Sequence, residues 1–151
     1  MSVSPLKQIL KKINTEMRLM DCNDKGDHDM PVKKVLIIDD EEFFCRAIKK
    51  ALESRSAFHV LTATRGDDGI RLAKTQKPDI ILLDIMMPDV DGNDVAKELS
   101  ESPITASIPV LFVTALISRE EVRKSGGVIG GRNFIAKPVI IDELIKKINA
   151  I

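Results

Sequence analysis

Short, uninterrupted apolar runs recur along this chain after residue 31, and a polar or charged residue follows each of them. The runs are Val35-Leu36-Ile37-Ile38, Ile80-Ile81-Leu82-Leu83, Val110-Leu111-Phe112-Val113 and Phe134-Ile135-Ala136. A strand with one solvated face alternates apolar and polar residues, whereas a parallel strand buried on both faces is apolar throughout. The four runs therefore predict buried parallel strands.

Segments with the apolar spacing of helices lie between these runs. We predict strands over 33–38, 59–63, 79–83, 109–113 and 132–136, and helices over 42–53, 66–75, 92–99, 118–125 and 141–149. Strict alternation of strand and helix is typical of a βαβ series. With right-handed crossovers, the sequence predicts an α/β fold with a doubly wound five-stranded parallel sheet, flavodoxin-like, in the order 2-1-3-4-5, with helices on both faces.

Residues 1–31 follow a different pattern. Apolar residues between Leu6 and Met20 recur at helical spacing, and a stretch rich in Asp and Asn follows them. We predict an N-terminal amphipathic arm and polar linker over 1–31 and the main domain over 32–151. Two interpretations of the arm stay open: a docking, dimerising or membrane-surface helix, and a partly ordered tail or a helix packed on its own domain.

Composition narrows the class of protein. The 151 residues have a formal net charge of zero, which gives no electrostatic reason to expect nucleic-acid or membrane binding. No apolar stretch reaches the ~18 residues of a membrane span, and we expect neither membrane insertion nor secretion. Cys22 and Cys45 lack metal-ligand spacing, so we interpret Cys45 as a small buried thiol and expect a cytoplasmic protein.

The polar residues that follow the runs carry the candidate chemistry. Asp39 and Asp40 follow the first run, Asp84 the second, Thr114 the third and Lys137 the fourth. In an open parallel sheet, functional residues gather beyond the carboxyl ends of the strands, so these side chains should converge at one edge. Three carboxylates at close range repel one another unless a cation lies between them, and Mg²⁺ prefers such oxygen ligands.

Among the acids, Asp84 ends the predicted central strand and is the best candidate nucleophile. A carboxylate that attacks phosphorus forms an acyl phosphate. Lys137 and Thr114 would then stabilise the charge that develops on the phosphoryl oxygens. Taken singly, each of these residues could equally be a turn or cap residue, but their joint order favours a reactive site. The Lys137-Pro138 bond is also a candidate for the cis form.

With these residues in place, the chain resembles the CheY-like receiver domain of two-component response regulators over residues 32–150. The resemblance rests on the motifs Val35-Leu36-Ile37-Ile38-Asp39-Asp40-Glu41, Leu82-Leu83-Asp84-Ile85-Met86-Met87-Pro88, Asp91-Gly92, Val113-Thr114-Ala115 and Phe134-Ile135-Ala136-Lys137-Pro138. It implies that residues 32–151 form a receiver domain. Such a domain catalyses only its own phosphorylation and dephosphorylation, in a two-component phosphorelay.

The resemblance also implies roles for individual residues. Asp84 would accept a phosphoryl group from a histidine kinase or a histidine phosphotransfer protein. Mg²⁺ would be held by Asp39, Asp40, Asp84 and the backbone carbonyl of Met86. Thr114 and Lys137 would contact the phosphoryl oxygens and carry the switch signal. Phe134 occupies the switch-aromatic position of the family, and its other interpretation is an ordinary core residue.

Three features depart from the family pattern. Met86 and Leu116, two residues after Asp84 and Thr114, cannot orient water by hydrogen bonding, which predicts a long-lived phosphorylated form. Glycines crowd residues 125–131, which predicts a mobile or differently shaped output face. Ile140 stands where a polar cap of the last helix is expected.

Two other classes of protein are alternatives to this one. A phosphohydrolase resembling the haloacid dehalogenases would need an Asp at the position of Met86. An interaction module that is never phosphorylated would not need the intact acid set. We expect output through contacts with an unknown downstream protein, and phosphorylation could promote homodimerisation.

Overall fold

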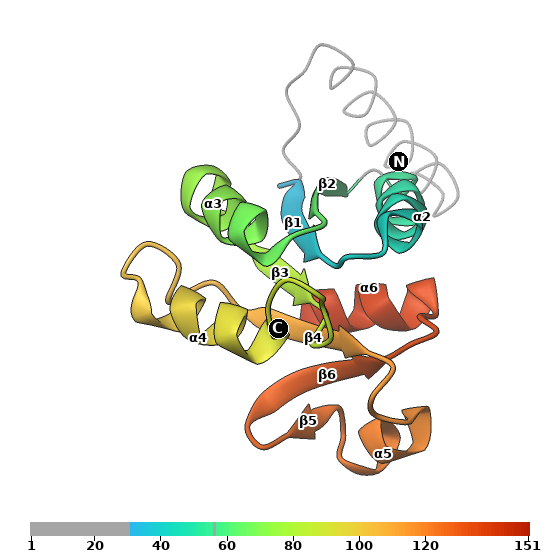
Figure 1. Ribbon diagram of the computed structural model, residues 1–151. Coiled ribbons are helices and arrows are strands. Elements are labelled where there is room, and N and C mark those ends of the chain that lie inside the picture. Colours follow the sequence, from blue (N-terminus) through green and yellow to red (C-terminus); the bar gives the residue numbers. More distant parts are fainter. Residues whose placement is uncertain (1–30, 56) are drawn as a thin grey trace, which may run out of the picture. The chain divides into compact units, whose positions relative to one another are not determined.

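The computed structural model describes residues 31–55 and 57–151 (Figure 1). The predicted N-terminal arm and linker lie, except for Pro31, outside the described residues. Within Val32–Ile151, strands and helices alternate as the apolar pattern predicts, except that the last two strands follow one another. The strands are β1 (Lys33–Ile38), β2 (Phe58–Ala63), β3 (Ile80–Leu83), β4 (Val110–Thr114), β5 (Val128–Ile129) and β6 (Arg132–Ala136).

These strands form one sheet in the order β2-β1-β3-β4-β6-β5. Its first five strands are parallel, and the chain changes direction along the sheet at β1, which lies between β2 and β3. The predicted flavodoxin-like α/β fold is therefore confirmed. At the β2 edge, the Val60 amide donates to the carboxylate of Glu53 at 3.0 Å.

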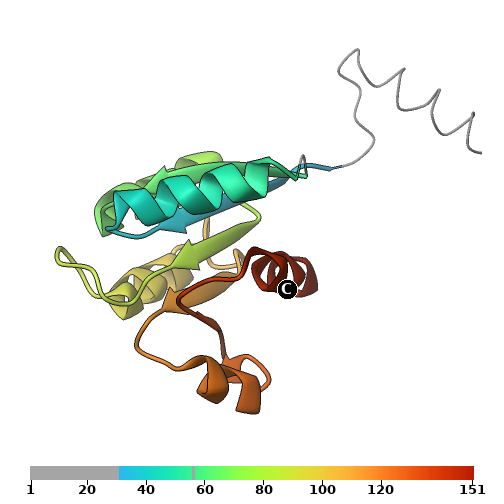
Figure 2. The ribbon, with the colours of Figure 1, turned by 90° about the vertical axis from the view of Figure 1, so that its right-hand side faces the viewer.

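Helices cover both faces of the sheet (Figures 1 and 2). They are α2 (Glu42–Glu53), α3 (Gly66–Gln76), α4 (Gly92–Glu101), α5 (Arg119–Lys124) and α6 (Ile141–Ala150). Successive residues of β1 point to opposite faces: Val35 packs in one apolar cluster with α2 and α6, and Leu36 packs in the other with α3 and α4. Two cores therefore hold the sheet between them, which leaves the carboxyl ends of its strands for polar residues.

The sixth strand corrects the five-stranded prediction. β5 pairs with β6 in the antiparallel direction, and the turn between them is Gly130-Gly131, with φ of +57° and +78°. Two successive positive φ values are typical of the tight hairpin turns that match strand twist, and glycine adopts them without steric cost. The glycine-rich segment thus adds a short hairpin to the sheet edge, while α5 ends at Lys124 with no buried residue.

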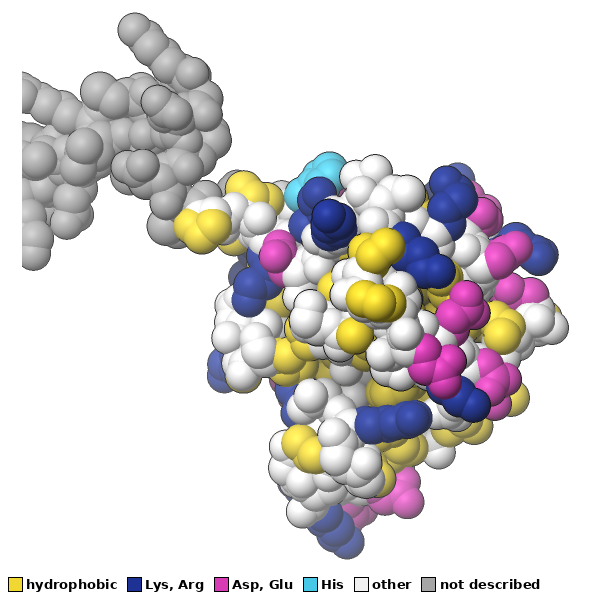
Figure 3. Space-filling view, turned by 90° about the vertical axis from the view of Figure 1, so that its left-hand side faces the viewer, with side chains coloured by type: hydrophobic (Ala, Val, Ile, Leu, Met, Phe, Trp, Pro, Cys, Tyr) yellow, Lys and Arg dark blue, Asp and Glu magenta, His cyan; other side chains and the backbone are white. Residues whose placement is uncertain are grey.

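Within the described part of the chain, no helix is long and apolar enough to cross a membrane. Figure 3 views the molecule from the side of α3 and α4, where basic and acidic side chains are interspersed with hydrophobic patches. This face therefore has no extended field of a single sign, in agreement with the net charge of zero.

Candidate active site

Three carboxylates meet at the carboxyl ends of β1 and β3. The two strands are neighbours, with Ile38 opposite Leu83, and the Asp84 amide donates to the Ile38 carbonyl at 3.0 Å. Asp39 and Asp84 therefore leave the sheet side by side. One carboxylate oxygen from each of Asp39, Asp40 and Asp84 lies within 4.8 Å of the others.

Lys137 is the counterion of this cluster. Its Nζ lies 2.7 Å from Asp39 Oδ2 and 3.6 Å from Asp84 Oδ2, and the side chain is only 12% exposed. Two neighbours of Lys137 are not apparent from the strand-end pattern. The Glu41 carboxylate lies 3.5 Å from Nζ, and the Phe44 ring lies beneath it, with its centroid at 4.3 Å. The ammonium is thus held between the acids and an aromatic face.

Burial sets the electrostatics of the site. Asp39 and Asp84 are buried, and Asp40 is exposed. Burial raises the pKa of Asp39, and it also raises the pKa of Asp84, where the charge of Asp39 adds to the effect and Lys137 opposes it. Burial disfavours the charged form of Lys137, but its hydrogen bond to Asp39 and the nearby carboxylates outweigh burial and raise its pKa. Lys137 is therefore a fixed positive charge.

Thr114 and Lys137 are aligned by their strands. Thr114 ends β4, is buried, and lies opposite Ala136 of β6, and its carbonyl accepts the Lys137 amide at 2.9 Å. The Thr114 hydroxyl accepts a hydrogen bond from the Leu116 amide at 3.1 Å, which orients this oxygen toward its own loop. The Lys137-Pro138 bond is cis, as predicted.

The loop after Asp84 is folded back on itself. Met86 and Asp91 form an antiparallel bridge, and the Gly92 amide donates to the Ile85 carbonyl at 2.7 Å. Asp91 then caps α4, since its side chain accepts from the Asn93 amide at 2.8 Å. These bonds close the loop at its base, two residues after Asp84.

Met86 and Leu116, the two apolar departures from the family pattern, share one hollow. Their side chains are 64% and 57% exposed, and both line an open hollow of about 640 Å³. Phe134 lies elsewhere: it is buried, and its ring stacks on Phe112 with a centroid distance of 5.1 Å. In this structure Phe134 has the position of a core residue, and its role as a switch stays a prediction.

The acid set suits a hard divalent cation. Asp39, Asp40 and Asp84 supply oxygen atoms alone, and the described residues bring no thiolate or imidazole into this cluster. Oxygen-only sites with few protein ligands are those that Mg²⁺ occupies in phosphoryl-transfer proteins. The residues present therefore fit the predicted metal, and among the described residues Lys137 is the cation that lies beside them.

Comparison with known proteins gives the same assignment as the motifs. Residues 35–149 match the family model described as the response regulator receiver domain. Protein PilH of Pseudomonas aeruginosa is 36% identical over 118 residues, which cover 78% of this chain and 96% of PilH. The alkaline phosphatase synthesis transcriptional regulatory protein PhoP of Bacillus subtilis is 37% identical over 79% of this chain, but the chain spans only 48% of PhoP.

Solved structures of receiver domains are similar to this chain as well. The receiver domain of the Francisella response regulator 1452 is 33% identical, with a TM-score of 0.64, and covers 78% of this chain and 94% of its own. The chemotaxis protein CheY4 of Vibrio cholerae has a TM-score of 0.67 over 79% of this chain and 98% of its own. At 24% identity, this second likeness shows the fold alone. Together these matches confirm the resemblance that the sequence motifs indicate.

Proposed function

This chain belongs to the response regulator receiver domain family, and we propose that Asp84 is the residue on which it accepts a phosphoryl group. Receiver domains are the phosphoacceptors of two-component systems and interact with kinases or phosphotransfer proteins. The observation that supports Asp84 is its position: it follows the central strand β3, beside Asp39 and 3.6 Å from Lys137.

The reaction follows from these positions. A carboxylate oxygen of Asp84 attacks the phosphorus of the donor, a new P–O bond forms, and the bond from phosphorus to the histidine nitrogen of the donor breaks. Lys137 and Thr114 stabilise the charge on the transferred phosphoryl oxygens. Hydrolysis transfers the phosphoryl group of the acyl phosphate to water, which releases inorganic phosphate and restores the carboxylate of Asp84, so the residue that is modified belongs to the domain itself.

Asp39, Asp40 and Asp84 would hold the metal, together with the backbone carbonyl of Met86. Bound Mg²⁺ would supply positive charge next to the incoming phosphoryl group. Asp39 has a second role in the protein itself, because it holds Lys137 at 2.7 Å and keeps the ammonium at the mouth of the site. The Glu41 amide donates to Asp39 at 2.9 Å and fixes the orientation of this carboxylate.

Four exposed apolar residues, here called the apolar rim, follow the strand ends that carry the acids and would form a docking surface for a protein donor. Phe43, Met86, Leu116 and Ile140 are 86%, 64%, 57% and 44% exposed, and they follow the carboxyl ends of β1, β3, β4 and β6. A donor that brings a phosphohistidine to Asp84 must cover this edge of the sheet. Exposed apolar side chains around a polar centre are typical of protein-binding sites.

Phosphorylation of Asp84 is tested with acetyl phosphate and Mg²⁺, read by intact mass. We expect one phosphoryl group on the wild type and none on Asp84→Asn. Asp79→Asn is the matched control, because Asp79 lies at the opposite end of β3 and accepts a hydrogen bond that Asn can keep. A wild-type protein that gains no mass would overturn the proposal, and size-exclusion chromatography of the same samples tests dimerisation.

The rim is tested by comparing two kinds of donor. Phe43→Ala should slow transfer from a phosphorylated histidine phosphotransfer protein and leave the reaction with acetyl phosphate unchanged. Ile104→Ala is the control, since Ile104 is 53% exposed but lies between α4 and the start of β4, on the side of the amino ends of the strands. Equal slowing with both donors would mean that Phe43 supports the reaction centre and is not a docking residue.

A further inference from the structure

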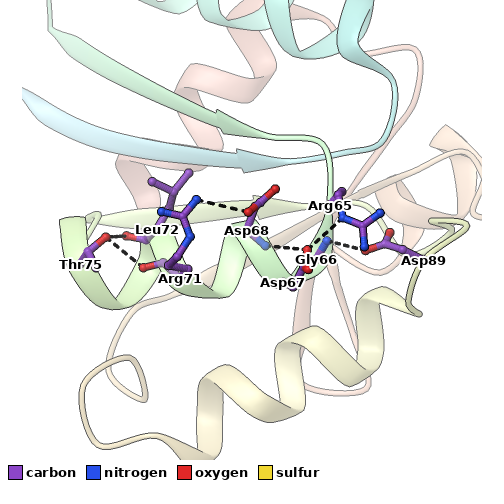
Figure 4. Close-up of polar contacts among 8 residues, drawn as sticks. All are labelled: Arg65, Gly66, Asp67, Asp68, Arg71, Leu72, Thr75 and Asp89. Carbon is purple, nitrogen blue, oxygen red and sulfur yellow. Dashed lines mark hydrogen bonds and ion pairs between the residues drawn. The ribbon is translucent and has the colours of Figure 1, made fainter.

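Helix α3 begins without a capping side chain of its own. Its N-cap residue is Arg65, which makes no side-chain capping bond because it has no acceptor oxygen. The first helical amide, that of Gly66, instead donates to Asp89 Oδ2 at 2.8 Å (Figure 4). The cap thus comes from the loop after β3, the same loop that contains Met86.

The two segments are also in direct van der Waals contact. A Cβ on Gly66 would lie 2.2 Å from Val90 Cγ1 and 3.0 Å from Val95 Cγ2, so only glycine permits this approach. Arg65 adds charge to the contact: hydrogen bonding to Asp67 is the main cause of its raised pKa, and the charge of Asp89 contributes. The loop and the start of α3 therefore form one packed and hydrogen-bonded unit.

The two ends of the loop are joined to each other, and its middle is bonded to α3. At its base, the Gly92 amide bonds to the Ile85 carbonyl at 2.7 Å, and Met86 bridges to Asp91. Residues 87–90, the middle of the loop, make no backbone–backbone hydrogen bond, and Asp89 accepts the hydrogen bond from the Gly66 amide. Without this bond, the apolar contacts of Met87 and Val90 would hold the segment between Met86 and Asp91, and its polar link to α3 would be lost.

We propose that Asp89 is a positioning residue for the metal site: its bond to Gly66 holds the loop so that the Met86 carbonyl keeps its place beside Asp84. This inference rests on the proposed function, because it takes Mg²⁺ as the ligand. It goes beyond that function in giving α3, a helix with no residue in the acid cluster, a part in forming the site.

Three variants separate the hydrogen bond from charge and from helix stability. Asp89→Ala removes the acceptor, whereas Asp89→Asn removes the charge and keeps an acceptor oxygen. Asp67→Ala is the matched control, because Asp67 lies in the first turn of the same helix and carries the same charge. It bonds only within that turn, to Arg65 Nε at 3.2 Å and to the Asp68 amide at 2.9 Å (Figure 4).

The measurement is Mg²⁺ affinity by isothermal titration calorimetry, with hydrogen exchange of residues 85–92 as a second readout. We expect Asp89→Ala to weaken Mg²⁺ binding about tenfold, at the low end for residues that orient metal ligands, and to speed exchange of the Gly92 amide. Asp89→Asn and Asp67→Ala should stay within about twofold of the wild type, since neither removes that acceptor. A fourth variant, Asp89→Ser, shortens the side chain and should behave like Asp89→Ala.

Two results would overturn the role of Asp89. One is wild-type Mg²⁺ affinity in both Asp89→Ala and Asp89→Ser. The other is an equal loss in Asp89→Asn or Asp67→Ala, which would assign the effect to charge. A wild-type protein that binds no Mg²⁺ is a different result: it contradicts the metal site of the proposed function, and the positioning role with it.

Discussion

Two loops of this domain depend on glycine for two different reasons. The loop after β3 ends at Gly92, where a Cβ would meet the Asp84 carbonyl oxygen at 2.1 Å and Ile85 Cα at 2.7 Å. The segment between α5 and β6 contains Gly126 and Gly130, where φ is positive but no atom lies within 4 Å of a built Cβ. The first loop needs the space, and the second needs the backbone conformation.

The difference shows how the molecule divides its tasks. Around Asp84, packing and side-chain hydrogen bonds fix the loop, so its backbone oxygens are available at set positions. Around the hairpin, Gly126 and Gly130 have positive φ in open space, and α5 beside it buries no residue. Changes of sequence should therefore damage the first region through steric overlap and the second through torsional strain.

The largest expected effect is that of Gly92→Ala. The new methyl group would overlap backbone atoms, which cannot move aside as a flexible side chain can, so we expect a loss of about 3 kcal/mol in the free energy of unfolding. Gly126→Ala, at φ +69° in open space, should lose only about 1 kcal/mol. Urea denaturation measures both, and equal losses would contradict the distinction between the two loops.

Gly130→Val should come next. A β-branched residue at φ +57° is strongly disfavoured, and we expect a loss of about 2 kcal/mol in the free energy of unfolding. Asn adopts positive φ more readily, so Gly130→Asn should lose less than about 1 kcal/mol. Thermal unfolding of the pair tests this ranking. If the two variants were equally stable, torsion could not be what fixes the hairpin.

Met86→Asn tests whether the hollow beside Asp84 controls the lifetime of the phosphorylated form. An amide can orient water where a thioether cannot, and we expect hydrolysis of the acyl phosphate to accelerate about tenfold, well below the effect of a full catalytic base. The loss of phosphate is followed by intact mass. Gly130→Asn is the control and should decay like the wild type, and an unchanged rate in Met86→Asn would refute the prediction.

Arg132→Ala is expected to have the smallest effect. Arg132 joins the two regions, because its guanidinium donates to Asn93 Oδ1 at 2.6 Å and its Cζ lies 5.2 Å from the centroid of the Phe112 ring. Arg132 itself is exposed and its bond to Asn93 lies at the surface, so we expect a loss of about 0.5 to 1 kcal/mol in the free energy of unfolding. Arg123→Ala, at another exposed arginine, is the control. A larger loss would mean that the two loops are energetically linked.

Most of the fold could be predicted because consecutive apolar residues indicate strands that are buried on both faces. The run Ile80-Ile81-Leu82-Leu83 is buried throughout, and a buried parallel strand is the simplest structure that such a run can form. The pair Val128-Ile129 is too short to give such a signal. Its pairing with β6 depends on a glycine turn whose torsions are visible only in three dimensions, so β5 was missed.

The acid cluster was predictable for a related reason: strand ends in a parallel sheet share an edge, so Asp39 and Asp84 could be placed together before any contact was known. Contacts that depend on the path of a loop could not be predicted in this way. Phe44 beneath Lys137 and Asp89 at the start of α3 belong to this group. One signal was available, since Arg65 cannot cap a helix and a cap had to come from elsewhere.

The two edges of the sheet also bear on how the protein behaves when it is concentrated. An exposed edge strand is a template on which strands of other molecules can pair, the first step toward aggregates. Here β5 offers only Val128 and Ile129 before the chain turns back, and at β2 the Glu53 carboxylate occupies the Val60 amide. Each edge is thus shortened or blocked, so the domain should remain dispersed at concentrations where a long open edge would seed fibrils.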